Sequence, residues 1–280
     1  MSGASERAGM PPGAVPGPGP GRDPRAGGRV EIVALEGIGE VSVGDDVGAL
    51  VARALGVTSG VPPLHPDDVL VVTQKIVSKA EGAVVDLREV EPRPEALAFG
   101  TRWDRDPRQV EVVLREAVRV VRMERGVIIT ETRHGFVLAN SGVDASNVGP
   151  GSGDVVTLLP RDPDASAARI RAAVREAHDV DLAVIVSDSF GRPWRWGIVD
   201  VAIGVSGLLP VEDLRGLEDA DGRVMRSTIR AVADEIASAA ELALGKSARR
   251  PVAIVRGALP TRGDGSIGDI VMPARFDLFP

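Results

Sequence analysis

The sequence predicts an α+β fold of mixed sheets packed with helices, in two closely associated lobes over residues 29–280. Short apolar runs typical of strands occur together with longer stretches that have a helical apolar period, and the two kinds do not alternate strictly. No internal repeat is visible. A chain of 280 residues is long enough for one large domain or two intimately packed ones, and we favour the second arrangement.

The first elements follow from composition and capping residues. Residues 1–28 are half Gly and Pro and offer little to bury, so we expect a disordered tail there. A strand at 30–35 ends in a glycine turn. The helix that follows can be capped by Asp45 or Asp46 and ended by Gly56.

The later elements follow from the same patterns. Residues 68–73 form an apolar strand, and 83–87 can continue its sheet. Apolar spacing predicts one helix over 108–124. The other expected elements are a hairpin of strands 127–131 and 135–139, a helix at 163–178, a strand at 182–187 followed by a loop with Asp188, an apolar stretch at 199–207, an irregular charged segment at 212–226, a helix at 228–244 and a strand at 252–256.

Composition excludes several classes of protein. The net charge of -7 argues against a general nucleic-acid binder, which needs a basic face. No cysteine is present, so disulfides, iron-sulfur clusters and thiolate zinc sites are excluded. The three histidines show no ligand spacing, which disfavours a zinc site. No apolar run approaches the roughly 20 residues of a membrane span. We therefore expect a cytoplasmic protein that binds neither nucleic acid nor membrane.

Two carboxylates stand where apolar strands are expected to end. Asp144 lies in a loop with the amides Asn140 and Asn147, and Asp188 follows the second strand. Hard cations take oxygen ligands and keep open positions for substrate oxygens, so these carboxylates are typical of a metal site that handles phosphate. The hydroxyl of Ser189 could complete the shell of a magnesium ion.

Each candidate residue also has a purely structural interpretation. Asp144 could make an Asx turn, and Asp188 could cap a helix. Lys79 would by default be a solvated surface lysine. Arg192 and Arg195 flank two tryptophans; they could bind a carboxylate or phosphate between stacking indoles, or they could be packing residues.

Two glycine patterns imitate nucleotide-binding loops without meeting their requirements. Gly245-Lys-Ser247 resembles the end of a P-loop, but position 240 is Ala and the triplet ends a helix instead of opening one. The glycines at 149–153 precede a strand where a Rossmann fingerprint demands a helix. We therefore expect neither a P-loop nor a Rossmann fold.

Five segments, taken together, point to one family. They are Val77–Gly82, Gly135–Val148, Asp188–Arg195, and Val232–Glu235 with Val255–Gly257. In this order they resemble the coenzyme F420:L-glutamate ligase family, the gamma-glutamyl ligases of deazaflavin coenzyme biosynthesis. The resemblance runs from about Val30 to the C-terminus. Some relatives carry a second, flavin-binding domain, and we expect the single-domain form here.

The resemblance implies a GTP-dependent and divalent-metal-dependent ligation. GTP would phosphorylate the carboxylate of the coenzyme F420 precursor, and the amine of L-glutamate would attack the acyl phosphate and release GDP and phosphate. The ions expected are Mg²⁺ or Mn²⁺, two per site, with K⁺ as a further candidate. The family also implies a homodimer.

The resemblance further implies roles for individual residues. Asp144 and Asp188 would bind metal, and Ser189 would take the position of the second metal. No residue is assigned as the catalytic base, and a metal-contacting glutamine of one relative falls near Arg226, which cannot ligate a cation. The residues implied to contact GTP are Leu35, Glu36, Gly37, Ile38, Gln74, Lys79 and Asn147.

Two alternatives to this ligase stay open from the sequence. One is a catalytically silent GTP-binding regulatory protein on the same scaffold. The other is an amide ligase that acts on a different carboxylate substrate. Turnover with GTP, a divalent ion, glutamate and the precursor separates all three.

Overall fold

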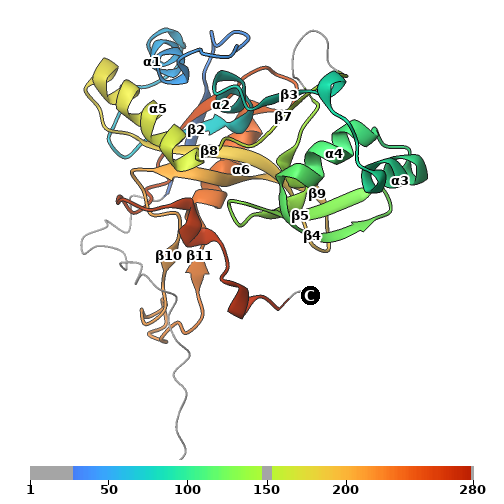
Figure 1. The fold of residues 1–280 in the computed structure, drawn as a ribbon. Coiled ribbons are helices and arrows are strands. Elements are labelled where there is room, and N and C mark those ends of the chain that lie inside the picture. Colours follow the sequence, from blue (N-terminus) through green and yellow to red (C-terminus); the bar gives the residue numbers. More distant parts are fainter. Residues whose placement is uncertain (1–27, 147–152, 279–280) are drawn as a thin grey trace, which may run out of the picture.

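The computed structural model describes residues 28–146 and 153–278 (Figure 1). The expected tail at 1–28 lies outside this range apart from Gly28, and so does Asn147. The disorder of the tail and the contact of Asn147 with GTP therefore remain predictions. Within the described residues the α+β class is confirmed, because helices and several separate sheets are mixed along the chain.

The main sheet has five strands in the order β1-β12-β2-β8-β9. Only β2 and β8 pair in parallel, and the other three pairs are antiparallel, so the sheet is not a Rossmann arrangement. The strands are β1 (Glu31–Ala34), β2 (Val69–Thr73), β8 (Ala183–Arg192), β9 (Arg195–Ser206) and β12 (Val252–Arg256). The centre of the sheet is apolar and fully buried, as expected for strands covered on both faces.

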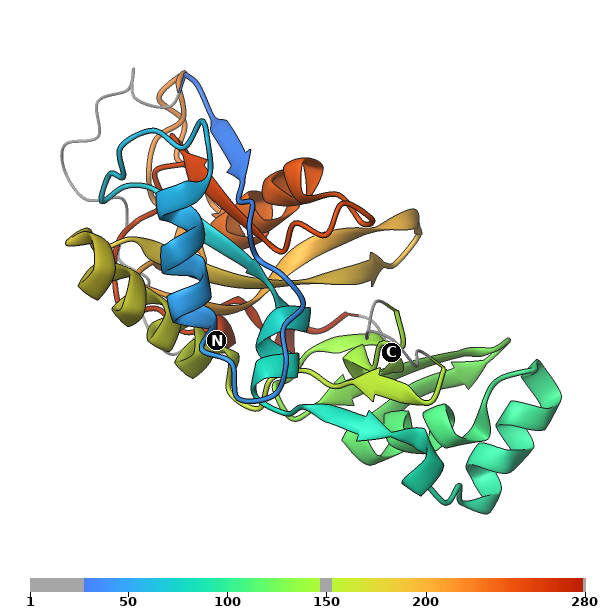
Figure 2. The ribbon, with the colours of Figure 1, turned by 90° about the horizontal axis from the view of Figure 1, so that it is seen from above.

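Helices cover both faces of this sheet. Figure 2 shows α1 and α5 on one side and α6 on the other. The helices here are α1 (Val47–Val57), α2 (Gln74–Ala80), α5 (Pro163–His178) and α6 (Val232–Leu244). Gly48 in α1 allows close approach to α5, because a Cβ there would lie 2.6 Å from the Cβ of Ala173.

A second group of elements has its own hydrophobic core. It combines α3 (Pro94–Trp103) and α4 (Pro107–Glu116) with the antiparallel sheet β4 (Ala117–Glu124), β5 (Val127–Thr132) and β6 (Val137–Ala139). Its buried side chains, among them Phe99 and Ile128, form a cluster separate from the core of the main sheet. The division of residues 29–280 into two closely associated lobes stays a prediction.

Short elements complete the fold. Two ribbons of paired strands are β3 (Val84–Asp86) with β7 (Val155–Thr157), and β10 (Glu212–Asp213) with β11 (Ile229–Arg230). The single-turn 3₁₀ helices are η1 (Leu87–Glu89), η2 (Asn140–Gly142), η3 (Ile267–Ile270) and η4 (Ala274–Phe276).

Four expectations from the sequence are wrong in detail. The helix expected over 108–124 ends at Glu116, and the β-branched continuation is strand β4, because it pairs with β5. Gly56 lies inside α1, which Thr58 caps. Residues 83–87 leave the main sheet, since β3 pairs with β7. Asp188 lies within β8, which continues to Arg192, so it neither follows the strand in a loop nor caps a helix.

A buried carboxylate anchors the second core. Glu111 of α4, 3% exposed, accepts hydrogen bonds from the backbone and guanidinium of Arg93 and from Arg115. The hydrogen bond from Arg93 is the main cause that lowers the pKa of Glu111 to about 2. The stabilisation is therefore complete above the unfolded pKa near 4.5 and is lost as the pH falls toward 2.

We expect Glu111→Gln to destabilise the protein by about 3 kcal/mol at pH 7, because it breaks a buried ion pair. Urea unfolding measures this, and the difference from wild type should shrink between pH 5 and pH 3. Glu124→Gln is the control: its carboxylate pairs with Arg122 at the surface, so its effect should stay below about 1 kcal/mol. Equal effects of the two substitutions would contradict the assignment.

Candidate functional site

Asp188 lies just beyond the point where the neighbouring strand β2 ends. Strand β2 ends at Thr73, which pairs with Ser187, whereas β8 runs on. Asp188 is therefore next to the turn from β2 into α2, the position beyond a strand's carboxyl end where open sheets place sites. Burial, together with the nearby charges of Asp144 and Asp200, raises the pKa of Asp188 to about 7. The carboxyl thus stands in a partly buried group of negative charges.

Asp144 approaches from the second core, just after β6 and η2. Its backbone exchanges two hydrogen bonds with Thr157, which fixes its position between β6 and β7. Its carboxylate accepts the Ser146 amide at 2.6 Å and the Lys75 ammonium at 2.8 Å. Burial raises its pKa, but the hydrogen bonds from Lys75 and Ser146 outweigh burial and leave that pKa below its ordinary value. Asp144 therefore makes the Asx turn of the structural interpretation, and its negative charge also acts on Asp188.

Ser189 faces away from these two carboxylates. Neighbouring residues of a strand point to opposite faces, so the side chains of Asp188 and Ser189 diverge. Ser189 pairs across the sheet with Asp200 of β9, and its hydroxyl donates to the Asp200 carboxylate at 2.7 Å. Asp200 is 3% exposed. The site consequently has two compartments, Asp144 with Asp188 on one face and Ser189 with Asp200 on the other.

A lysine lies against the second compartment. Lys246, just after α6, donates to the Asp200 carboxylate at 2.8 Å and to the Ser189 hydroxyl at 2.5 Å. Burial lowers the pKa of Lys246, but its bond to Asp200 more than compensates, and the pKa is raised overall. Each compartment therefore combines acidic groups with one ammonium group, Lys75 or Lys246.

The first compartment fits a hard divalent ion. Asp144 and Asp188 present carboxylate oxygens from two elements, and Asp188 is a buried acid whose ionised form a cation would favour. Among the described residues, no three His, Cys, Asp or Glu side chains are grouped closely enough to hold a metal unaided. Mg²⁺ commonly binds through one or two carboxylates plus water and phosphate oxygens, so two carboxylates are sufficient.

Of the residues implied to contact GTP, those that the structure describes lie on the loop after β1 and on α2. Leu35 and Ile38 are buried, whereas Glu36 and Gly37 are exposed, and the Glu36 amide donates to the Thr58 hydroxyl. Gln74 is 2% exposed, and its amide nitrogen donates to Ser78 and to the Leu158 carbonyl. In this structure the Gln74 side chain joins α2 to the residue that follows β7.

Lys79 is not the solvated surface lysine of the default interpretation. It is 8% exposed, and its ammonium donates to the Glu40 carboxylate at 2.5 Å. Glu40 is exposed and follows the loop after β1. Lys79 thus joins α2 to the segment that holds Glu36 and Gly37.

Arg192 and Arg195 flank the turn of the β8–β9 hairpin. Trp194 is 83% exposed and Trp196 fully exposed, so neither indole packs into the core of this chain, whereas Arg192 is partly buried. One guanidinium nitrogen of Arg192 lies 3.5 Å from the Trp196 carbonyl. Binding of a substrate by these arginines stays a prediction.

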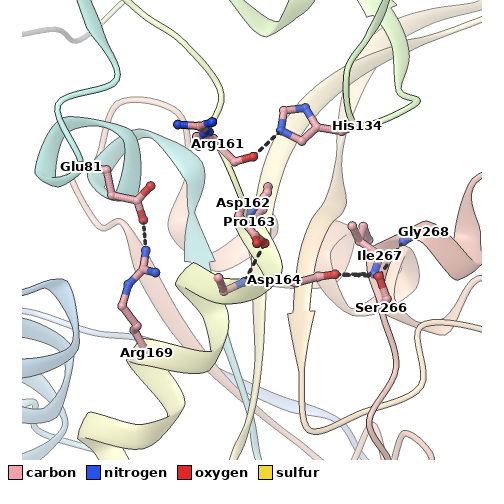
Figure 3. A pocket seen from close by; sticks show the side chains of 11 residues that line it. Glu81, His134, Arg161, Asp162, Pro163, Asp164, Arg169, Ser266, Ile267 and Gly268 are labelled. Atoms are coloured by element: carbon pink, nitrogen blue, oxygen red, sulfur yellow. Dashed lines mark hydrogen bonds and ion pairs between the residues drawn. The ribbon is translucent and has the colours of Figure 1, made fainter.

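A pocket of about 710 Å³ lies elsewhere, between the start of α5 and η3 (Figure 3). Its polar groups are mostly paired with one another: Arg169 with Glu81, and Asp164 with Ser266. His134 contacts the Pro160 and Arg161 carbonyls at its rim. It shares no residue with the two compartments, and no role is assigned to it.

Comparison with known proteins adds independent evidence. The family model described as F420-0:Gamma-glutamyl ligase matches residues 37–257. The chain belongs to this ligase family. Three similar relatives are each named coenzyme F420:L-glutamate ligase. The one from Methanothermobacter thermautotrophicus is 43% identical over 89% of this chain and 98% of its own length. The one from Methanopyrus kandleri is 46% identical over 83% of this chain and 88% of its own length. The one from Methanocaldococcus jannaschii is 41% identical over 78% of this chain and 86% of its own length.

The family assignment agrees with the resemblance drawn from the sequence. Three residues of the two compartments, however, are not predicted from the sequence. For Asp200 a signal exists, because it is a single carboxylate in an apolar stretch. For Lys75, beside Gln74, no local pattern in the sequence predicts a role. Lys246 belongs to the P-loop imitation Gly245–Ser247, and the structure confirms that this triplet follows the end of a helix.

The described part of the chain contains no helix with both the length and the apolarity needed to cross a bilayer.

Proposed function

We propose that this member of the F420-0:gamma-glutamyl ligase family joins L-glutamate to the coenzyme F420 precursor in a reaction that consumes GTP and requires a divalent ion. The observation that carries the proposal is that Asp144, from a different part of the chain and bonded to Lys75, lies within electrostatic range of the buried carboxyl of Asp188. The family supplies the substrates, and this arrangement suits phosphoryl transfer.

Asp144 and Asp188 would hold the ion, Mg²⁺ or Mn²⁺. When bound there, such an ion neutralises charge on a transferring phosphoryl group. Lys75 already balances the Asp144 carboxylate and lies within electrostatic range of Asp188. Its ammonium can therefore also stabilise charge on phosphate oxygens brought to this compartment.

The proposed chemistry has two steps. A carboxylate oxygen of the precursor attacks the γ-phosphorus of GTP; the bond to the bridging oxygen breaks, and GDP leaves with an acyl phosphate formed. The glutamate amine then attacks the acyl carbon, phosphate leaves with its electron pair, and the amine loses a proton. Positioning and charge stabilisation by the site dominate both steps, and no covalent enzyme intermediate is required.

The nucleotide would lie along the loop after β1 and the start of α2. We propose contacts from the Leu35–Ile38 turn, Lys79 and Asn147, with Gln74 supporting the helix beneath. The exposed Gly37, whose φ is +78°, offers close backbone approach. Asn147 lies outside the described residues, so its part rests on the family resemblance alone.

Turnover tests the proposal against its alternatives. Incubation with GTP, Mg²⁺ or Mn²⁺, L-glutamate and the precursor should release GDP and give a product heavier by one glutamyl residue. GTP binding without glutamate-dependent GDP release would favour a silent regulatory protein. Glutamate-dependent GDP release with another carboxylate acceptor, but not with the precursor, would show that the protein is an amide ligase that acts on a different substrate.

A second prediction concerns Lys79 and its partner. Lys79→Met should weaken GDP binding at least about tenfold, because it removes a charged donor to phosphate. Glu40→Gln removes the other half of the same ion pair but keeps the ammonium, and it should not weaken binding. Calorimetric titration with GDP and Mg²⁺ measures both. Equal weakening in the two variants would mean that the pair only supports the fold.

We also propose a homodimer, as the resemblance implies. The β8–β9 hairpin offers a surface for it, since Trp194, Trp196 and Ile198 are exposed there. Light scattering after size exclusion should give twice the chain mass. A double substitution Trp196→Ser and Ile198→Ser should shift the protein toward the monomer.

A further inference from the structure

We propose that one face of the β8–β9 hairpin binds the acceptor substrate of the ligation, an elongated carboxylic acid with a flat ring. The apolar side chains of Phe190 and Val199 lie beneath the ring, and the guanidinium groups of Arg192 and Arg195 bind its outer oxygen atoms. These four residues are called the acceptor face. The inference rests on the proposed function, which brings the acceptor's carboxylate to Asp188.

The acceptor face continues directly from Asp188. Side chains alternate along a strand, so Asp188, Phe190 and Arg192 of β8 point to the same side of the sheet. Residues directly opposite each other in an antiparallel pair share a face. Val199 lies opposite Phe190, and Arg195 lies opposite Arg192. The register shift before the last pair skips two residues of β9 and none of β8, so the alternation along β8 is kept.

Phe190 and Val199 give this face an apolar centre. Both side chains are partly buried, which leaves apolar surface open between Asp188 and the two arginines. The ring of Phe136, 6% exposed, meets the ring of Phe190 edge-on with their centroids 6.0 Å apart, and so holds it in place. Flat rings pack well against aromatic and branched apolar side chains. At about 3.3 Å per residue, the stretch from Asp188 to Arg192 is about 13 Å long, which suits an elongated ligand.

Arg192 and Arg195 lie at the end of this stretch without a carboxylate partner in the described part of the chain. Like charges directly opposite each other in a sheet are destabilising, so the pair gains from a ligand with negative or polar oxygens. The Nε of Arg192 is buried and has no hydrogen-bond partner among the described residues. A buried donor without an acceptor costs free energy. A guanidinium fork can bind the oxygen atoms of a planar group.

The acceptor is the substrate that fits this arrangement. L-Glutamate has no apolar part that could cover Phe190 and Val199, and GTP is proposed to lie along α2 instead. A deazaflavin ring combines a flat apolar surface with oxygen atoms at its rim. The surface proposed for the dimer does not coincide with the acceptor face, because Ile198 lies opposite Gly191 on the other side of the sheet.

Titration of the whole protein with the precursor tests the inference. The ring absorbs light, so binding can be followed in the presence of GDP and Mg²⁺. Arg192→Gln and Arg195→Gln should each raise the Kd of the precursor about tenfold, because each removes a charge-assisted hydrogen bond. The KM values for GTP and L-glutamate should stay within about twofold. Arg53→Gln, at an exposed position of α1, removes the same charge and should bind the precursor like wild type.

The other outcomes separate this inference from the proposed function. An unchanged precursor Kd in both arginine variants would overturn the inference while the ligase activity stands. A rise in the KM for L-glutamate alone would assign the arginines to glutamate and would also overturn it. A lower mass in light scattering with an unchanged Kd would show that they pair with a second copy. Absence of glutamate-dependent GDP release by the wild type would overturn the proposed function instead.

The apolar centre provides the second arm of the test. Val199→Ser should raise the Kd of the precursor about fivefold, because it removes apolar surface beneath the ring. Val199→Ile keeps that surface and should bind within about twofold of wild type. Circular dichroism confirms that each variant is folded. Equal binding by folded Val199→Ser and wild type would overturn the placement of the ring on this face.

Discussion

Asp188→Asn should reduce turnover by about 1,000-fold or more while leaving the protein folded. The substitution keeps the size of the side chain and removes one of two carboxylates proposed to hold the ion, so the loss falls on the chemical step. Stability should not fall, because burial and the charges of Asp144 and Asp200 already disfavour an ionised group at this position. Steady-state GDP release and thermal unfolding measure the two effects.

Asp234→Asn is the matched control. Asp234 is a partly buried carboxyl of α6 whose pKa burial raises, and it accepts the Ala202 amide, which an asparagine can also do. Its turnover should stay within a fewfold of wild type. Near wild-type rates in Asp188→Asn would show that this carboxyl is structural and would remove the proposed ion from β8.

Asp144→Asn should also reduce turnover by orders of magnitude, but for two combined reasons. It removes a carboxylate from the ion and releases Lys75 from its ion pair. An asparagine can still accept the Ser146 amide, so the local turn should persist. Mn²⁺ affinity in the presence of GDP should fall together with the rate. Asp144→Ala should be less stable than Asp144→Asn and no more active.

Asp86→Asn controls for this change. Asp86, the last residue of β3 and the N-cap of η1, makes a similar local turn: it accepts the Arg88 amide and pairs with the Arg88 guanidinium. Both rate and Mn²⁺ affinity should be unaffected there. If Asp144→Asn lowered the rate without changing Mn²⁺ affinity, Asp144 would act on substrate and not on the ion.

Much of the fold could be predicted because each element carries a local signal. Helix α5 begins at Pro163 after the cap Asp162, and β12 is a continuous apolar run, so both bounds were recovered. The failure over 108–124 has a physical cause. An apolar spacing that fits a helix also fits a half-exposed strand, and only the pairing of β4 with β5 decides between them.

The candidate site was predictable only in part, because only some of its residues carry a local signal. Asp144 and Asp188 stand out as carboxylates after apolar runs, but their proximity depends on how β6 and β8 are placed. Lys246 lies 57 residues from Ser189 in sequence, and nothing local links them. The opposite facing of Asp188 and Ser189 follows only once both are known to lie inside one strand.

The most direct test of the central claim follows oxygen atoms through the reaction. The precursor, labelled with ¹⁸O at both carboxylate oxygens, is incubated with GTP, Mg²⁺ and L-glutamate. Attack of the carboxylate on GTP, followed by displacement of phosphate by the amine, predicts one ¹⁸O in the released phosphate and one in the new amide carbonyl. Phosphate free of ¹⁸O, formed together with the glutamylated product, would contradict an acyl-phosphate route at this site.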